Sequence, residues 1–176
     1  MSYNKLKSLV ANVEAIKTAL QIHIQGRQAT PEEKETLSQY SGFGGIKEVL
    51  NIGTDKPVSG DMEEPIRRLQ ELIDTYPYFT EAMKASVLTA FYTPPVVIRA
   101  MYQVLANLGF QTGNILEPSC GVGNFMGLLP EEMGNSKMYG VELDSISGRI
   151  AQQLYQKNNI AVQGFETVSY THLRAH

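Results

Sequence analysis

Short apolar segments alternate with helical patterns in the C-terminal half of this 176-residue chain. The segments are 114–116, 139–141 and 160–162, and a helical pattern with apolar residues every three or four positions begins near Pro95. A similar pattern, from Ile146 to Leu154, separates the second and third segments. Strands that alternate with helices form parallel sheets with right-handed crossovers. The sequence therefore predicts an α/β fold containing a βαβαβ unit with a parallel sheet.

The first ninety residues carry helical patterns without strand signals. Apolar residues from Leu6 to Ile24 recur at helical spacing, and Gly26 is a plausible end for that helix. Thr30 to Glu33 have the composition of a capping box, with proline in the first helical position, so a second helix is expected to run to about Tyr40. It is expected to break at 41–45, where three of the last four residues are glycine.

A connection rich in Gly, Pro, Asp and Ser occupies residues 51–62. It precedes a helix expected near Glu64–Thr75 and a shorter one through Val87, for which Thr80 is the expected N-terminal cap. We therefore expect three parts: a helical N-terminal module over 1–89, an α/β domain over 90–168, and a tail over 169–176.

Charge and composition exclude several classes of protein. The net charge of −3 is spread evenly along the chain, which disfavours a free-standing binder of the nucleic-acid backbone. A single cysteine excludes an internal disulfide framework, and three histidines without a Cys/His cluster predict no metal site. No apolar run reaches the ~20 residues that span a bilayer, and no signal-peptide pattern is present, so the expected location is cytoplasmic.

The expected ligand site lies at the carboxyl ends of the strands, where parallel sheets bind their ligands. Glu117 ends the first strand and Glu142 the second. Between the first strand and its helix, residues 117–123 form a segment that we call the glycine loop, in which Gly121 and Gly123 permit a sharp turn and close approach to a ligand. The following helix would direct free N–H groups at the same place. A carboxylate at the end of the second strand can accept hydrogen bonds from ribose hydroxyls.

A dinucleotide site would use the same ribose-binding acid, so the glycine spacing must decide. The GxGxxG pattern requires glycine at 126, where this chain has Met126, and the third glycine comes one position later. Glu117 would repel a pyrophosphate but attract an ammonium group. S-adenosylmethionine, an adenosine that carries an amino acid, suits both acids and is the expected cofactor. A NAD-binding oxidoreductase is the alternative.

Three segments resemble the motifs of DNA amino-methyltransferases of the adenine-N6 type. LEPSCGVGNF (116–125) is similar to their first motif and YGVELD (139–144) to their second. AFYTPP (90–95) is similar to the motif that precedes both in the gamma-ordered class. This resemblance implies a Rossmann-like S-adenosylmethionine-dependent methyltransferase fold, of which the βαβαβ unit is the cofactor-binding half. It also implies methyl transfer to the exocyclic amine of an extruded adenine.

The resemblance also implies roles for individual residues. Thr93 and Pro94 would border the methionine part of the cofactor, and Glu117 with the glycine loop would contact its amino acid group. Glu142 would bind the ribose, and Leu143 would cover one face of the adenine. The complete set of expected cofactor-binding residues is Tyr92, Thr93, Pro94, Glu117, Pro118, Ser119, Cys120, Gly121, Gly123, Asn124, Phe125, Glu142, Leu143 and Phe165.

A narrower resemblance adds the segment YSGFGGIKEVL (40–50). Followed at a distance by TAFYTPP, it is similar to the methylase region near the start of very large methylase–helicase proteins of phages, plasmids and conjugative elements. That similarity covers residues 28–168 and implies a fused helicase region in a parent protein.

Two departures from the family pattern matter. The third motif would bring an acid to the adenine amine, but this region reads Gln163 to Glu166, where Glu166 is a weak candidate and Phe165 a residue that could stack. The [DNS]PP[YFW] motif, which holds the flipped base, is absent, so the resemblance implies that catalytic residues and most DNA contacts lie beyond this chain. The final SYTHLRAH resembles translated sequencing-adapter read-through and is expected to be non-native. The chain alone is thus expected to be inactive.

Other interpretations stay open. Within the methyltransferase class, the alternatives are a modification subunit of a type I restriction system and an N4-cytosine enzyme. Outside it, a non-catalytic scaffold could use the helical module to dock a partner. Cys120 could be read as a nucleophile toward cytosine, but no base or cation stands nearby in the sequence, so a lining residue of the glycine loop is the favoured interpretation.

Overall fold

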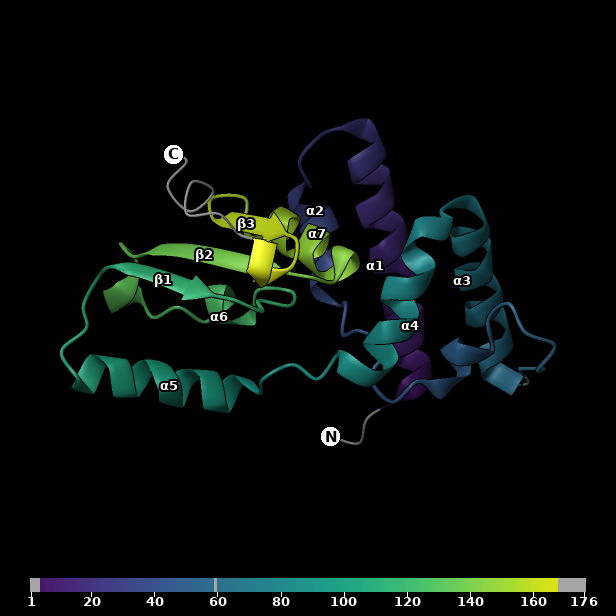
Figure 1. Ribbon diagram of the computed structural model, residues 1–176, viewed down its shortest axis with the longest axis horizontal. Helices are drawn as coiled ribbons and strands as arrows, with labels where there is room; N and C mark the ends of the chain where they lie inside the picture. The colour runs from purple at the N-terminus through teal and green to yellow at the C-terminus, as the bar shows by residue number, and fades with distance from the viewer. Residues whose placement is uncertain (1–3, 59, 168–176) are drawn as a thin grey trace. The chain divides into compact units, whose positions relative to one another are not determined.

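The computed structural model describes residues 4–58 and 60–167 (Figure 1). It divides into two compact units, Met1–Phe91 and Tyr92–His176. The first unit is helical. Its elements are α1 (Lys5–Gln25), α2 (Pro31–Ser38), η1 (Lys47–Asn51), η2 (Gly60–Met62), α3 (Glu63–Thr75), η3 (Pro77–Phe79) and α4 (Thr80–Thr89).

Both ends of α1 are capped by residues of the sequence pattern. The side chain of Asn4 accepts a hydrogen bond of 3.0 Å from the Lys7 N–H, and Gly26 takes a left-handed conformation with φ of 62° at the C-terminal end. Between them, the apolar stripe of α1, including Leu9 and Ile16, is buried. The predicted extent of this helix and its end at Gly26 are confirmed.

The predicted capping box starts α2. The Thr30 hydroxyl accepts a hydrogen bond of 3.3 Å from the Glu33 N–H, and the Glu33 carboxylate accepts one of 2.9 Å from the Thr30 N–H. The Arg27 guanidinium also pairs with Glu33, which lowers the pKa of that carboxyl to about 2. The helix ends at Ser38, two residues before the predicted end.

A buried amide holds the 41–45 segment, which breaks the helical pattern as predicted. Asn12, fully buried on α1, donates a hydrogen bond of 2.6 Å to the Gly42 carbonyl and accepts one of 2.9 Å from the Ser41 N–H. A Cβ at Gly44 would lie 2.5 Å from the carbonyl oxygen of Ala90. Glycine at 44 therefore allows this segment to pack directly against the main chain that follows α4.

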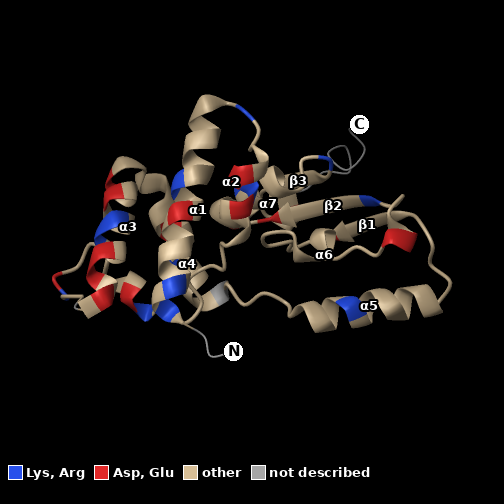
Figure 2. Cartoon of the chain, turned by 180° about the vertical axis from the view of Figure 1, so that it is seen from behind, with Lys and Arg blue, Asp and Glu red and all other residues tan. Residues whose placement is uncertain are grey.

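The next two helices agree with the pattern in position but not in every cap. Ile66, Leu69 and Ile73 form the buried face of α3, and Figure 2 shows acidic and basic residues alternating along the helix. The prediction that Thr80 caps α4 is wrong, because Thr80 is the first helical residue and the cap position belongs to Phe79, without a side-chain hydrogen bond. The preceding turn η3 runs directly into the helix and leaves no extended residue to act as a cap.

The second unit contains the predicted βαβαβ arrangement. Its strands β1 (Asn114–Glu117), β2 (Lys137–Glu142) and β3 (Asn159–Val162) form a parallel sheet in the order β1-β2-β3 (Figure 1). The other elements are α5 (Pro95–Asn107), α6 (Asn124–Gly127), η4 (Glu131–Met133), α7 (Ser145–Leu154) and η5 (Phe165–Thr167). The predicted fold class, a Rossmann-like parallel sheet preceded by a helical module, is confirmed.

The register brings the strand ends to one edge of the sheet. Glu117 of β1 pairs with Gly140, and Glu142 of β2 pairs with Val162, the last residue of β3. The N–H of Gln163 then donates a hydrogen bond of 2.9 Å to the Glu142 carbonyl. Both acids predicted for the ligand site therefore lie at the carboxyl edge.

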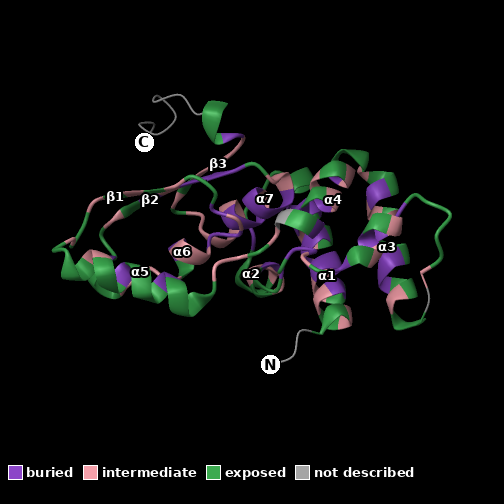
Figure 3. Cartoon of the chain, turned by 60° about the horizontal axis from the view of Figure 1, so that its bottom comes forward, coloured by how far each residue is buried: buried purple, intermediate pink, exposed green. Residues whose placement is uncertain are grey.

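The helix α5 buries only part of its apolar surface. Ile98 and Tyr102 are buried with Met133 in a small core, whereas Val96, Val97, Met101, Val104 and the C-cap residue Leu108 are exposed. Most of α5 is accordingly coloured as exposed in Figure 3, and Arg99 is its single charged residue. Exposed apolar faces of this kind are typical of surfaces against which another element packs.

Candidate functional site

The Glu142 carboxylate holds the glycine loop against β2. The side chain is buried, with 8% of its residue surface exposed. One oxygen accepts a hydrogen bond of 2.6 Å from the Gly121 N–H, and the other accepts one of 2.8 Å from the Asp144 N–H. Each carboxylate oxygen has lone pairs left for a further donor. Glu142 is thus both a tether for the loop and a hydrogen-bond acceptor at the strand end.

Backbone bonds and two left-handed glycines give the glycine loop its turn. The Cys120 N–H donates to the Val141 carbonyl at 2.9 Å, and the Gly123 N–H donates to the Cys120 carbonyl at 2.8 Å. Gly121 has φ of 55° and Gly123 of 86°, conformations that side chains disfavour. The backbone conformation at 121 and 123 is thus one that favours glycine, as the sequence predicted. The helix that follows, α6, has only four residues.

A hydrogen-bond chain joins Tyr92 to the Glu142 region. The Tyr92 hydroxyl lies 3.2 Å from the Ser147 hydroxyl, which in turn donates to the Asp144 carboxylate. The Tyr92 ring packs on the glycine loop, because a Cβ at Gly121 would lie 2.8 Å from the ring. Burial raises the pKa of Tyr92 to about 12, so the phenol stays protonated and can donate. All three predicted motifs therefore meet in one network.

Glu117 occupies a different environment from Glu142. One of its carboxylate oxygens, Oε2, is buried and has no hydrogen-bond partner among the residues that the structure describes. Burial, together with the charge of Glu142, raises the pKa of the Glu117 carboxyl to about 8. A buried acceptor without a partner is costly unless it is protonated or meets a donor from a ligand.

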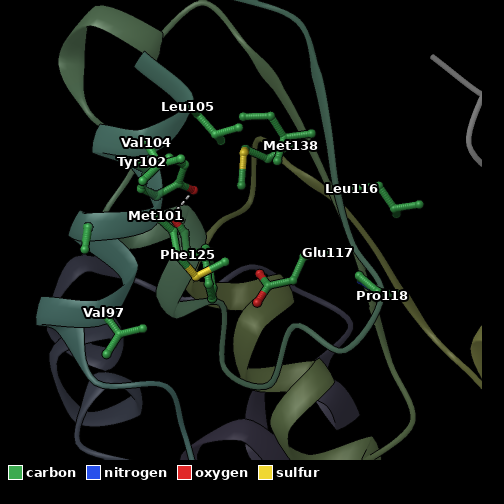
Figure 4. Close-up of a pocket in the computed structure, with 12 residues that line it drawn as sticks. Val97, Met101, Tyr102, Val104, Leu105, Leu116, Glu117, Pro118, Phe125 and Met138 are labelled. Carbon is green, nitrogen blue, oxygen red and sulfur yellow. Dashed lines mark hydrogen bonds between the residues drawn. The ribbon is translucent and has the colours of Figure 1, made fainter. Parts of the chain in front are cut away.

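The Glu117 carboxyl points into a cavity of about 630 Å³ between α5 and β1 (Figure 4). The remaining walls are almost entirely apolar and include Val97, Met101 and Phe125. The Tyr102 hydroxyl, on the same helix, donates to the Phe125 carbonyl at 2.8 Å. Glu117 is therefore the acidic group in an otherwise apolar space.

Exposed apolar side chains flank the same edge of the sheet. Leu143, directly after β2, is 76% exposed, and Phe165, shortly after β3, is 50% exposed. Both were expected near the adenine. Their open surfaces lie on consecutive strand ends, which suits the two sides of a flat apolar ring.

The other predicted residues are dispersed around this edge. Thr93 is half-buried, Pro94 is the N-cap of α5, and Pro118 and Ser119 are exposed on the glycine loop. Asn124 is half-buried at the start of α6.

Cys120 is a buried lining residue of the glycine loop. Burial raises the pKa of its thiol to about 12, which disfavours the thiolate that a nucleophile needs. A Cβ at Gly140 on β2 would lie 2.8 Å from the Cys120 sulfur. Gly140 therefore makes room for this side chain.

Several residues at the site carried no predicted role. Asp144 caps α7 by accepting from the Ile146 N–H at 3.0 Å, and Ser147 bridges it to Tyr92. The pattern of an aspartate before a helical segment was a visible capping signal. Tyr155 and Gly140 gave no such signal, because their importance depends on contacts with distant residues.

Two kinds of feature, a metal-binding cluster and a membrane-spanning helix, are not found in the part of the chain that the structure describes. Among residues 4–58 and 60–167, no group of three or more His, Cys, Asp or Glu side chains is arranged to hold a metal ion. Within the same residues, no helix combines the length and apolar character needed to cross a membrane.

Comparisons with known proteins give two sequence relatives. No protein-family model matches the chain. It is 26% identical over 168 residues to the defense against restriction protein B of Escherichia phage P1, a match that covers 96% of this chain and 6% of that protein. It is 36% identical over 77 residues to the type II methyltransferase M.CvrRI of Paramecium bursaria Chlorella virus XZ-6E. That match covers 44% of this chain and 20% of the viral protein.

A solved structure described as a modification subunit of a type I restriction enzyme from Vibrio vulnificus YJ016 also aligns with the chain. The alignment has a TM-score of 0.35 at 14% identity and covers 92% of this chain and 49% of that one. The resemblance that the three motifs predicted is confirmed by the sequence relatives, which include a methyltransferase and a phage protein. The chain spans only a small part of the length of either.

Proposed function

We propose that this chain is the S-adenosylmethionine-binding part of a DNA adenine-N6 methyltransferase. The observation that carries the proposal is the network at the carboxyl edge, in which Glu142 tethers Gly121 while Tyr92 packs on the same glycine. Three separate sequence motifs thus converge on one ligand-sized region. The 36% identity to a type II methyltransferase supports the same class.

The residues present suit this cofactor. The buried Glu117 oxygen without a partner needs a donor, and the ammonium group of the amino acid would supply one. Glu142 keeps lone pairs for the ribose hydroxyls, and the open faces of Leu143 and Phe165 suit the adenine. When bound, S-adenosylmethionine supplies a methyl group activated by its sulfonium. This chain would bind and orient that group.

The methyl acceptor in this proposal is the exocyclic amine of an adenine extruded from DNA. Residues that hold the base, most of the DNA contacts and a fused helicase region would lie in a longer parent protein. The matched relatives, of which the chain spans 6% and 20%, are long enough to contain such parts. The printed name of the phage relative supports a role connected with restriction.

Calorimetry with S-adenosylhomocysteine, the demethylated product, tests the cofactor assignment directly. The chain, and the chain extended along its reading frame, should bind this ligand and should not bind NAD. Binding of NAD alone would favour the oxidoreductase alternative. Failure of both proteins to bind any adenosyl ligand would favour a non-catalytic scaffold and contradict the proposal.

The base assignment requires a separate experiment. The extended protein should transfer tritium from labelled S-adenosylmethionine to duplexes that contain adenine, and hydrolysis of the product should yield N6-methyladenine. Label recovered as N4-methylcytosine would replace adenine by cytosine in the proposal while leaving the cofactor assignment intact.

A further inference from the structure

Tyr155 contacts the cofactor-site backbone from the far end of α7. It is the C-cap residue of that helix, and its half-buried ring packs against the core formed by Cys120, Met126 and Met138. Burial, with a smaller contribution from Glu117, raises the pKa of its phenol. No sequence motif includes this tyrosine.

The Tyr155 ring lies against two glycines at once. A Cβ at Gly123 would lie 2.5 Å from Cε2 and 2.6 Å from Cδ2 of the ring. A Cβ at Gly127 would lie 3.2 Å from Cζ and closer still to the hydroxyl oxygen. Non-bonded carbon atoms are at their optimum near ~3.5–4.0 Å, so neither position accepts a side chain while the ring stays in place.

The two glycines differ in what their backbones require. Gly123 has a φ of 86° and is left-handed, so it would be strained with any side chain even without the ring. Gly127 lies within α6 and is not among the glycines of positive φ. At a helical position without positive φ, glycine has no backbone advantage over alanine. The Tyr155 ring is therefore the contact that excludes a side chain at 127.

Backbone hydrogen bonds connect the two glycines that the Tyr155 ring contacts to the rest of the glycine loop. The Gly127 N–H donates to the Gly123 carbonyl at 3.0 Å, and the Gly123 N–H donates to the Cys120 carbonyl at 2.8 Å. The next residue, Gly121, is held by Glu142 and covered by the Tyr92 ring. The loop is thus braced at one glycine by Tyr92 and at the other by Tyr155.

We infer that Tyr155 is a positioning residue for the glycine loop: its ring sets the backbone at Gly123 and Gly127 and thereby the part of the site that receives the amino acid group of the cofactor. This inference rests on the proposed function. It explains why the third glycine falls at 127, one position later than in a dinucleotide fingerprint.

A comparison of two ligands tests the positioning role. S-adenosylhomocysteine carries the amino acid group, whereas adenosine lacks it and depends on the Glu142 end of the site. Calorimetry on Tyr155→Ala should show affinity for S-adenosylhomocysteine weakened about tenfold and affinity for adenosine changed less than about twofold. Tyr155→Phe keeps the ring and should retain the affinity of the unaltered protein for both ligands.

A double-mutant cycle, made in the protein extended along its reading frame, tests the contact itself. Gly127→Ala should weaken S-adenosylhomocysteine binding about fivefold and lower the unfolding temperature when Tyr155 is present. In a Tyr155→Ala background, the same change should cost no affinity and should raise the unfolding temperature, because alanine favours the helix. Gly123→Ala is the matched control and should be harmful in both backgrounds because of its left-handed backbone.

The outcomes separate this inference from the function on which it rests. If the unaltered protein binds neither ligand, the proposed function fails and the inference fails with it. If it binds S-adenosylhomocysteine, but Tyr155→Ala weakens both ligands equally, the positioning role is overturned and the proposed function stands. The positioning role is also overturned if Gly127→Ala weakens S-adenosylhomocysteine binding equally in the presence and in the absence of Tyr155.

Discussion

Glu142 and Glu117 have different tasks although both end a strand at the same edge. Glu142 is already engaged by two backbone N–H groups, so its charge is compensated before any ligand arrives. Glu117 leaves a buried oxygen unpaired and has a pKa raised to about 8 by burial. Environment rather than residue type therefore decides which acid holds the loop and which keeps an unpaired, hard-to-ionise carboxyl.

Removing Glu142 should weaken ligand binding through both of its contacts. In Glu142→Ala, the Gly121 N–H loses its acceptor and the ribose loses its partner, and hydrogen bonds to charged groups contribute about 1.5–3 kcal/mol each. We expect at least about a tenfold loss of S-adenosylhomocysteine affinity by calorimetry. Glu131→Ala, which removes an exposed acid of the same unit, is the control. Unchanged affinity in Glu142→Ala would refute the ribose assignment.

Binding of the cationic amino group should depend on pH through Glu117. Below its pKa of about 8 this carboxyl is protonated, so binding of an ammonium group must expel the proton. Affinity should therefore rise between about pH 5.5 and 7.5, by up to about tenfold per pH unit for one proton expelled. Calorimetry across this range checks the slope. In Glu117→Gln the slope should vanish, and a slope that survives would place the amino group elsewhere.

The same carboxyl should affect stability in the absence of ligand. Its pKa is about 8 when folded against an ordinary value of 4.5, so the folded chain binds the proton more tightly than the unfolded chain. The contribution of Glu117 to stability is then complete below about pH 4.5 and declines as pH rises to about 8. Urea unfolding at several pH values should show this decline, and Glu117→Gln should flatten it. If the free energy of unfolding instead rises between about pH 4.5 and 8, as Glu117 ionises, the Glu117 carboxyl is not buried in the way the structure shows.

Among the elements, those with local end signals could be predicted from the sequence. Gly26 and the Thr30 capping box act within one turn of chain, so the ends that they define follow from neighbouring residues. The expected cap at Thr80 failed because a turn upstream supplies the first helical geometry. At the site, Glu117, Glu142 and the glycine loop were visible because strand ends gather at one edge. The Tyr155 contact was not, since it joins residues that are distant in sequence.

The uncovered elements of the second unit should promote self-association. Within the described residues β1 pairs only with β2, and four apolar side chains of α5 and that of its C-cap residue, Leu108, are exposed. Apolar faces and strand edges of this kind associate in water. We expect the chain alone to be poorly soluble or to lack a sharp thermal transition in near-UV circular dichroism. Changing Val104 and Leu108 to glutamine should raise its solubility. A sharp, reversible transition in a monomer would show that these elements are sufficient by themselves.

At the scale of the whole molecule, the chain by itself should not methylate DNA. The described residues supply a proposed cofactor site, and the base-holding motif of the DNA amino-methyltransferases that the chain resembles is absent from the sequence. Tritium transfer to adenine-containing duplexes should therefore stay at background, whereas the protein extended along its reading frame should be active. Transfer by the chain itself would mean that other residues hold the base. The predicted tail at 169–176 lies outside the described residues and has no part in this expectation.

The buried sulfur atoms have a practical consequence for crystallography. Met83, Met126, Met133 and Met138 are all nearly inaccessible, and Met126 lies against Gly140 beside the glycine loop. Side chains packed in this way have little freedom to move. Replacing their sulfur by selenium would place well-ordered anomalous scatterers in both units, one of them next to the ligand edge. Experimental phases from such a label would fix the position of each unit independently of any homologous structure.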